Sequence, residues 1–78
     1  MKTPDKTIIQ SLRERFPAGC RVELLVMDDS QAPPAGTLGA VVGVDDMGTI
    51  HVNWDNGSSL GVAYGPDYAV RADDDRDS

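Results

Sequence analysis

The chain has 78 residues, enough for one small domain with a thin core, and seven Lys and Arg against thirteen Asp and Glu give it a formal charge of −6. The phosphate backbone of DNA or RNA repels such an acidic chain, which argues against a nucleic-acid partner. The single cysteine, Cys20, excludes an internal disulfide. No apolar run approaches the length of a membrane span and no signal-peptide pattern opens the sequence, so we expect a cytoplasmic protein without a membrane partner.

The charge is unevenly distributed along the chain. Residues 1–16 carry four basic side chains against two acidic ones, residues 17–72 carry two against seven, and residues 73–78 carry one against four. The acidic character therefore belongs to the middle of the chain as well as to its end. We expect three parts: an N-terminal helix over 1–16, a β-barrel over 17–72 on which the helix packs, and a disordered acidic tail over 73–78.

Residues 3–16 have the pattern of a short amphipathic helix. Thr3 is a suitable N-cap, Pro4 suits the first turn, and Asp5 complements the positive end of the helix dipole. One apolar stripe follows at a spacing of four residues, formed by Ile8, Leu12 and Phe16. So short a helix is marginal alone, and we expect it to pack across an open end of the barrel. The alternative is a helix that contacts a partner or a second copy.

Residues 17–72 contain five short runs typical of β-strands, separated by turns rich in glycine. The runs are 20–27, 40–44, 49–54, 58–63 and 68–71. This pattern predicts a mainly β fold, a small SH3-like barrel of five strands with a short N-terminal α-helix.

The first two runs contain one irregularity each. The inward-facing residues expected of the first run are Val22, Leu24 and Val26. Leu25 breaks the alternation, so part of the outer face is expected under the helix. Gly43 interrupts the second run and predicts a bulge that turns both Val41 and Val44 inward.

The hairpin over 49–63 has two possible registers. A two-residue Asn-Gly loop sets polar residues opposite apolar ones, whereas a three-residue loop, 55–57, gathers the apolar residues on one face. The second register pairs Val52 with Leu60 and Ile50 with Val62. We therefore predict a loop closed by a G1 bulge, with Gly57 in the left-handed conformation and Trp54 in the core.

Several motifs resemble a family of short bacterial proteins known as domain of unknown function 4314. The motifs are GCRVEL (19–24), MDD (27–29), APPAGTLG (32–39) and VDDMGTIHVNWDNGS (44–58). The resemblance spans about residues 12–71 and implies an SH3-like barrel without an assigned activity. A fainter likeness, carried by the Gly-Thr entry, the Val-x-Trp-Asp-Asn-Gly-Ser turn and the later Gly65 and Tyr68, is to the Mind-bomb/Herc domain of eukaryotic ubiquitin ligases. That likeness implies the binding of protein segments.

Catalytic and metal-binding patterns are weak in this sequence. His51, the single histidine, falls on the outward face of its strand and is expected to be solvated, the alternative being a general base. Five acids could converge at one end of the barrel and hold a cation such as calcium, but acids are common in turns: Asp28, Asp29, Asp45, Asp46 and Asp55. We expect no catalytic residue, no metal ligand and no cofactor.

We predict that the protein is a non-enzymatic protein-binding or assembly module whose partner is an unidentified protein segment. The candidate surface lies in loops 28–35, 45–48 and 64–68. Its residues are Asp28, Asp29, Pro33, Pro34, Asp45, Asp46, Met47, Tyr64 and Tyr68. An acidic rim in two of these loops favours a basic or neutral partner. The alternative is a nucleic-acid-associated accessory barrel.

Overall fold

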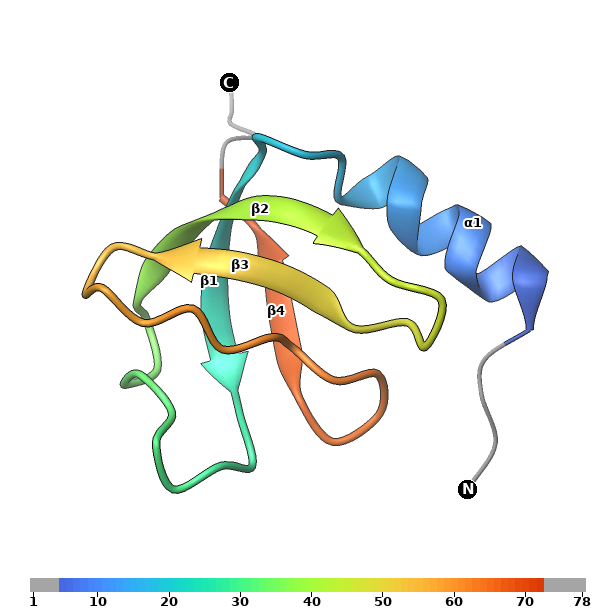
Figure 1. Cartoon of the computed structure of the whole chain (residues 1–78). Helices are drawn as coiled ribbons and strands as arrows, with labels where there is room; N and C mark the ends of the chain where they lie inside the picture. The colour runs from blue at the N-terminus through green and yellow to red at the C-terminus, as the bar shows by residue number, and fades with distance from the viewer. Residues whose placement is uncertain (1–4, 73–78) are drawn as a thin grey trace.

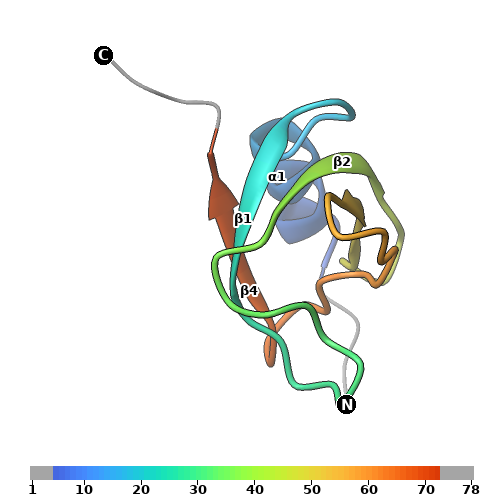
Figure 2. The ribbon, with the colours of Figure 1, turned by 90° about the vertical axis from the view of Figure 1, so that its left-hand side faces the viewer.

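The computed structural model describes residues 5–72, which form one short helix and one antiparallel sheet (Figure 1). The helix is α1 (Lys6–Arg15), and the strands are β1 (Arg21–Val26), β2 (Leu38–Val44), β3 (Ile50–Trp54) and β4 (Tyr68–Arg71). The strand order is β3-β2-β1-β4. The sheet curls strongly but does not close, and α1 lies at one end of it (Figure 2). The fold is mainly β, as predicted, with four strands instead of five.

The helix begins later than the sequence pattern indicated. Asp5 is its N-cap, because the Asp5 carboxylate accepts a hydrogen bond of 3.0 Å from the N–H of Ile8. The predicted cap Thr3 lies outside the described residues, as does the predicted acidic tail over 73–78. The apolar stripe is confirmed: Leu12 and Phe16 belong to the buried core, and Ile8 packs against that core.

Strand β1 departs from simple alternation in its second half. Val22 and Leu24 are buried, but Val26 is 56% exposed and Leu25 is exposed as well. The predictions that Val26 faces inward and that Leu25 lies under the helix are therefore wrong. The cause is a β-bulge between Leu24 and Val26 in the pairing with β4, which shifts the facing of every residue beyond it.

Strand β2 contains the bulge that its glycine predicted. The register against β3 shifts between Val41 and Gly43, so that Val41 is buried and Val44 packs against the core. Gly39, in the same strand, lies directly over Trp54 and Val52. A Cβ atom at this position would lie 2.8 Å from Cε3 of Trp54 and 2.9 Å from the carbonyl oxygen of Asn53. The close approach of β2 to β3 thus requires a glycine at position 39.

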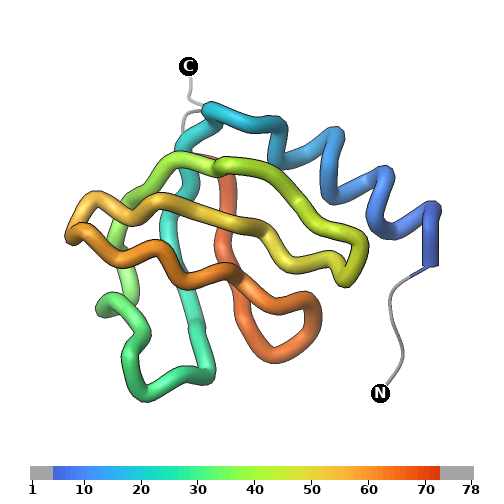
Figure 3. The backbone as a smooth tube through the Cα atoms, viewed as in Figure 1, coloured from blue at the N-terminus to red at the C-terminus, as the bar shows by residue number. Residues whose placement is uncertain are grey.

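The segment 58–63 runs beside β3 (Figure 3) but is not a regular strand. The predicted register holds at both ends: Ile50 and Val62 exchange hydrogen bonds of 3.0 and 2.8 Å, and the Trp54 N–H donates to the Ser58 carbonyl at 2.8 Å. Between them, the carbonyl of Leu60 accepts instead from the indole Nε1–H of Trp54 at 2.9 Å. The fourth predicted strand, 58–63, is not regular because a side chain takes the carbonyl that would continue the ladder, whereas the fifth, 68–71, is confirmed as β4.

The core and the hairpin loop agree with the sequence pattern. Trp54 is only 3% exposed, and Gly57 has a φ of +95° in a loop closed by the hydrogen bond from its N–H to the Trp54 carbonyl. The buried cluster joins the helix and the three longest strands with Val62. Its members are Leu12, Phe16, Cys20, Val22, Leu24, Val41, Ile50, Val52, Trp54 and Val62.

We predict that Gly39→Ala destabilises the protein by about 1–3 kcal/mol, because the added methyl group overpacks the contact between β2 and Trp54. The matched control is Gly43→Ala in the same strand, where no atom lies within 4 Å of the added Cβ. The control should stay within about 0.5 kcal/mol of the parent protein. The measurement is urea unfolding followed by Trp54 fluorescence, and equal midpoints for the two variants would contradict the packing described here.

Candidate binding groove between α1 and β4

An open groove of about 470 Å³ lies where the curled sheet fails to close. On one side is β4, on the other are Ile50 and the turn 64–67, and the C-terminal half of α1 contributes the floor. The lining residues are Leu12, Arg15, Phe16, Ile50, Tyr64, Gly65, Tyr68, Ala69 and Val70. Leu12, Phe16 and Ile50 also belong to the buried core, so the groove opens directly onto the hydrophobic interior.

Two arginines tie α1 in place beside the groove. Arg71 of β4 donates from Nη1 to the carbonyl of Arg15 at 2.8 Å, at the helix end where a cation complements the negative end of the dipole. Arg13 donates from Nε to the carbonyl of Val44 at 3.1 Å and from Nη2 to Asp46 at 2.9 Å. The helix is therefore anchored to β4 on one side and to the end of β2 on the other.

The turn 64–67 is held by the side chain of Asp67, the one polar or charged residue that is buried within residues 5–72. Its Oδ1 accepts from the N–H of Asp28 and its Oδ2 from the N–H of Ala63, each at 2.9 Å. Sequence reasoning missed this role, because an aspartate in a Gly-Pro-Asp turn looks solvated. The two bonds fix the position from which Tyr64 and Tyr68 project.

Both tyrosines lie at the rim of the groove and are largely open to solvent. Tyr64 is 50% exposed and Tyr68 is 65% exposed. Beside them, Ala69 lies opposite Leu24 in the pairing of β4 with β1. The Ala72 N–H donates to the Arg21 carbonyl at 2.9 Å. Because hydrogen-bonded and non-hydrogen-bonded pairs alternate along an antiparallel ladder, Val70 takes a bonding position and Ala69 a non-bonding one. The Ala69 N–H and C=O therefore point away from β1, toward the free edge of β4.

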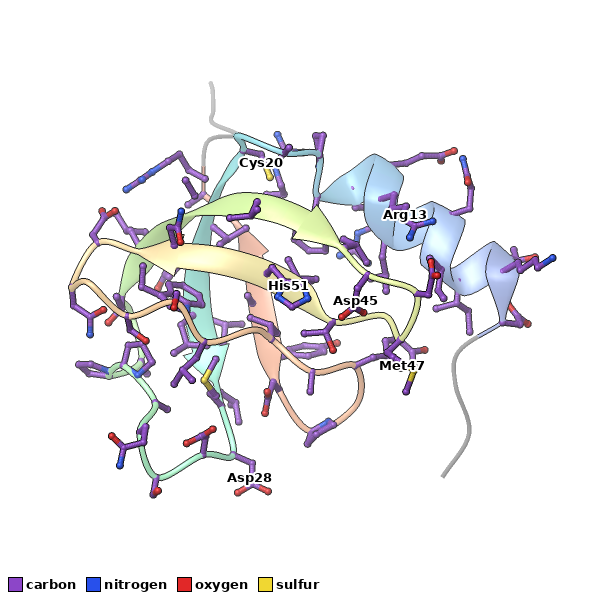
Figure 4. The ribbon with its side chains drawn as sticks, viewed as in Figure 1. Arg13, Cys20, Asp28, Asp45, Met47 and His51 are labelled. Carbon is purple, nitrogen blue, oxygen red and sulfur yellow. The ribbon has the colours of Figure 1, made fainter. Side chains whose placement is uncertain are left out.

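The other predicted surface residues lie outside the groove. Asp28, Asp29 and Pro34 are exposed in the loop after β1, whereas Pro33 is buried. Asp29 is engaged locally, since its Oδ1 accepts from the N–H of Gln31 at 2.7 Å. Figure 4 shows Asp28 well apart from Asp45 and Met47. The structure thus divides the predicted surface, and only Tyr64 and Tyr68 line the groove.

The turn between β2 and β3 is organised by Asp45. Its Oδ1 accepts from the N–H groups of Met47 at 2.9 Å and Thr49 at 3.0 Å, and its Oδ2 lies 2.8 Å from Nε2 of His51 (Figure 4). His51 is exposed on the outward face of β3, as expected, and is also paired with Asp45. The hydrogen bond from His51, followed by those from Thr49 and Met47, lowers the pKa of Asp45 below its ordinary value of 3.8.

The acids do not gather into a cation site. Asp45, Asp46 and Asp55 each pair with a different basic side chain, namely His51, Arg13 and Arg21. Within residues 5–72 no group of three or more His, Cys, Asp or Glu side chains is placed to hold a metal ion. The acids in these turns instead form ion pairs with basic side chains, and Asp45 also accepts hydrogen bonds from backbone N–H groups.

We predict that Asp67→Asn destabilises the protein by about 1–3 kcal/mol, because the amide that replaces one carboxylate oxygen cannot accept the second backbone N–H. The control is Asp29→Asn, an exposed aspartate with a single backbone donor, whose effect should stay within about 0.5 kcal/mol. Thermal unfolding by circular dichroism measures both. Similar melting temperatures for the two variants would show that the two hydrogen bonds accepted by Asp67 do not stabilise the protein.

We predict that Asp45→Ala lowers stability at neutral pH by about 1–2 kcal/mol, a range reduced for the 40% exposure of the side chain. Because the folded-state pKa is lowered, this contribution is present at pH values above the unfolded pKa and is lost as the pH falls through the folded pKa. The stability gap between parent and variant should therefore shrink below about pH 4 in urea titrations.

The control for this prediction is Asp46→Ala. Asp46 is the adjacent acid, its side chain is 97% exposed, and it makes one ion pair with Arg13. A surface ion pair contributes about 0–1 kcal/mol, so this variant should show a small gap. A gap for Asp45→Ala that stays constant from pH 7 to pH 3 would show that the carboxylate charge does not stabilise the turn.

Of three comparisons with known proteins, one finds a match. No curated protein matches it, and no solved structure matches it. No helix within residues 5–72 is long and apolar enough to cross a membrane. A family model, described as a domain of unknown function, matches residues 5–72, which is the whole of the chain that the structure describes. The chain therefore belongs to the DUF4314 family.

Proposed function

We propose that this protein is a small non-enzymatic binding module that takes a protein segment in the groove between α1 and β4. The observation that carries the proposal is the groove itself, which is lined by core residues and flanked by two solvent-open tyrosines. Tyrosine is enriched in protein interfaces because its ring supplies contact area at low entropic cost and its hydroxyl can bond to a partner.

The shape and the edge of the groove favour an extended segment as the ligand. Ala69 directs its backbone groups toward the free edge of β4, where an added strand finds a donor and an acceptor. An apolar side chain of that segment would pack against the part of the groove that Phe16 and Ile50 line. Backbone bonds would supply affinity, and the apolar floor would supply selectivity.

We further propose that the fold is an SH3-like small barrel in which segment 58–63 is an irregular fifth strand. The paired hydrogen bonds between Ile50 and Val62, and the bond from Trp54 to Ser58, support this reading of the segment. In such a barrel the gap that remains beside β4 is the candidate groove. A nucleic-acid role is less well supported, since two of the basic side chains described, Arg13 and Arg21, are paired with acids.

The test uses peptides selected from a phage-displayed library of random twelve-residue sequences on the immobilised full chain. We predict that binders are recovered and that titrating them shifts the amide resonances of residues 12–16 and 64–70. We predict further that Tyr68→Ala weakens binding by about 5–30-fold, because the ring forms the rim. The control Val42→Ala truncates a side chain that is 55% exposed but lies outside the groove.

The proposal fails if no binder is recovered, or if the shifts cluster on residues 28–35 and 45–48. It also fails if Val42→Ala and Tyr68→Ala weaken binding equally.

A further inference from the structure

We infer that the segment bound in this groove carries a carboxylate close to its apolar anchor, an inference that rests on the proposed function. Arg15 is the one charged residue among the nine that line the groove. It lies at the last position of α1, next to Phe16 in the floor. The groove therefore offers a hydrophobic floor and one positive charge side by side.

The guanidinium of Arg15 is held in a position suited to binding an anion. Its Cζ lies 5.2 Å from the centre of the Phe16 ring. A guanidinium that rests over a ring can still direct its N–H groups outward, where they match the two oxygens of a carboxylate. The backbone carbonyl of Arg15 is engaged by Arg71, which fixes the end of the helix below it.

Arg15 differs from Arg13 and Arg21, which both form ion pairs in the structure. Arg13 is paired with Asp46 and Arg21 is paired with Asp55, whereas Arg15 forms no ion pair with any of residues 5–72. A positive charge beside an apolar opening, without a pairing acid among residues 5–72, is complemented by an acid of the ligand.

The net charge of −6 does not oppose this inference at short range. Charges separated by more than about 8 Å are largely screened at physiological ionic strength. The nearby acid Asp67 is buried and accepts two backbone N–H groups. The inferred acidic ligand differs from the basic or neutral partner expected from the sequence, because that expectation placed the binding surface in the acidic loops.

The geometry also sets the spacing of the two features in the ligand. The guanidinium lies close above the Phe16 ring, and successive residues of an extended segment advance by about 3.3 Å. An apolar side chain over Phe16 and Ile50 therefore places a carboxylate one or two residues away within reach of Arg15. The expected ligand is an extended segment with a large apolar residue and an Asp or Glu at that separation.

The experiment selects peptides from the same random library on three full-length proteins: the parent, Arg15→Glu and Lys6→Glu. The two variants change the net charge equally on the same helix, but Lys6 lies outside the groove lining. For the parent and for Lys6→Glu we expect sequences that combine an apolar residue with Asp or Glu. For Arg15→Glu we expect Lys or Arg in place of the acid.

Affinities give the quantitative form of the test. The best acidic peptide from the parent should bind Arg15→Glu about tenfold or more weakly and should lose affinity as salt is raised from 50 to 300 mM. Because Glu at a helix C-terminus is unfavourable, Arg15→Gln serves as a second variant, with a loss of about fivefold. Thermal unfolding establishes that each variant is folded before it is used.

Two outcomes would overturn the inference, and they differ in what they leave standing. If the parent selects apolar peptides without an acidic preference, or if both glutamate variants change the preference alike, the carboxylate is refuted while peptide binding in the groove remains. If the parent selects no peptide that contacts residues 12–16 and 64–70, the proposed function fails together with the inference.

Discussion

The packing of Trp54 under strand β2 is the contact on which the rest of this small structure depends. Its indole ring lies against Gly39, where a side chain as small as a methyl group would collide with it. Its Nε1–H bonds to the carbonyl of Leu60, and its backbone N–H bonds to Ser58. One residue therefore sets the distance between β2 and β3 and also holds the segment that follows. In a chain of this size, few other contacts reach so many parts of the fold.

Trp54 also explains why the segment after the hairpin loop is irregular. Because the indole bonds to the Leu60 carbonyl, segment 58–63 pairs with β3 only near its two ends and does not form a regular strand. The gap that remains between this side of the sheet and β4 is lined by Leu12 of α1 and by Phe16, the C-cap of the helix. The helix is thus part of the core and not an appendage, and the groove is the part of the gap that it leaves uncovered.

Several of the acids within residues 5–72 bind groups of the same chain. Asp45 and Asp67 accept backbone N–H groups in two different turns, and Asp46 and Asp55 pair with arginines. Because these acids are paired in separate turns, the strongly acidic composition does not create one acidic binding face in the described structure. The charge that lines the groove is positive and comes from Arg15, in the basic N-terminal part of the chain.

Local pattern determined much of the secondary structure: the apolar stripe of α1, the alternation in β3, the bulge at Gly43 and the left-handed Gly57 all follow from residue type and spacing. Three features depended on tertiary contacts. The bulge after Leu24 turned Val26 outward, the Trp54 indole interrupted the predicted strand 58–63, and the groove formed from α1, Ile50 and β4, which are distant in sequence. Periodicity reports which residues share a face of one element, because it depends on the local backbone. It contains no information on which side chain will take a distant carbonyl or where two elements will leave a gap.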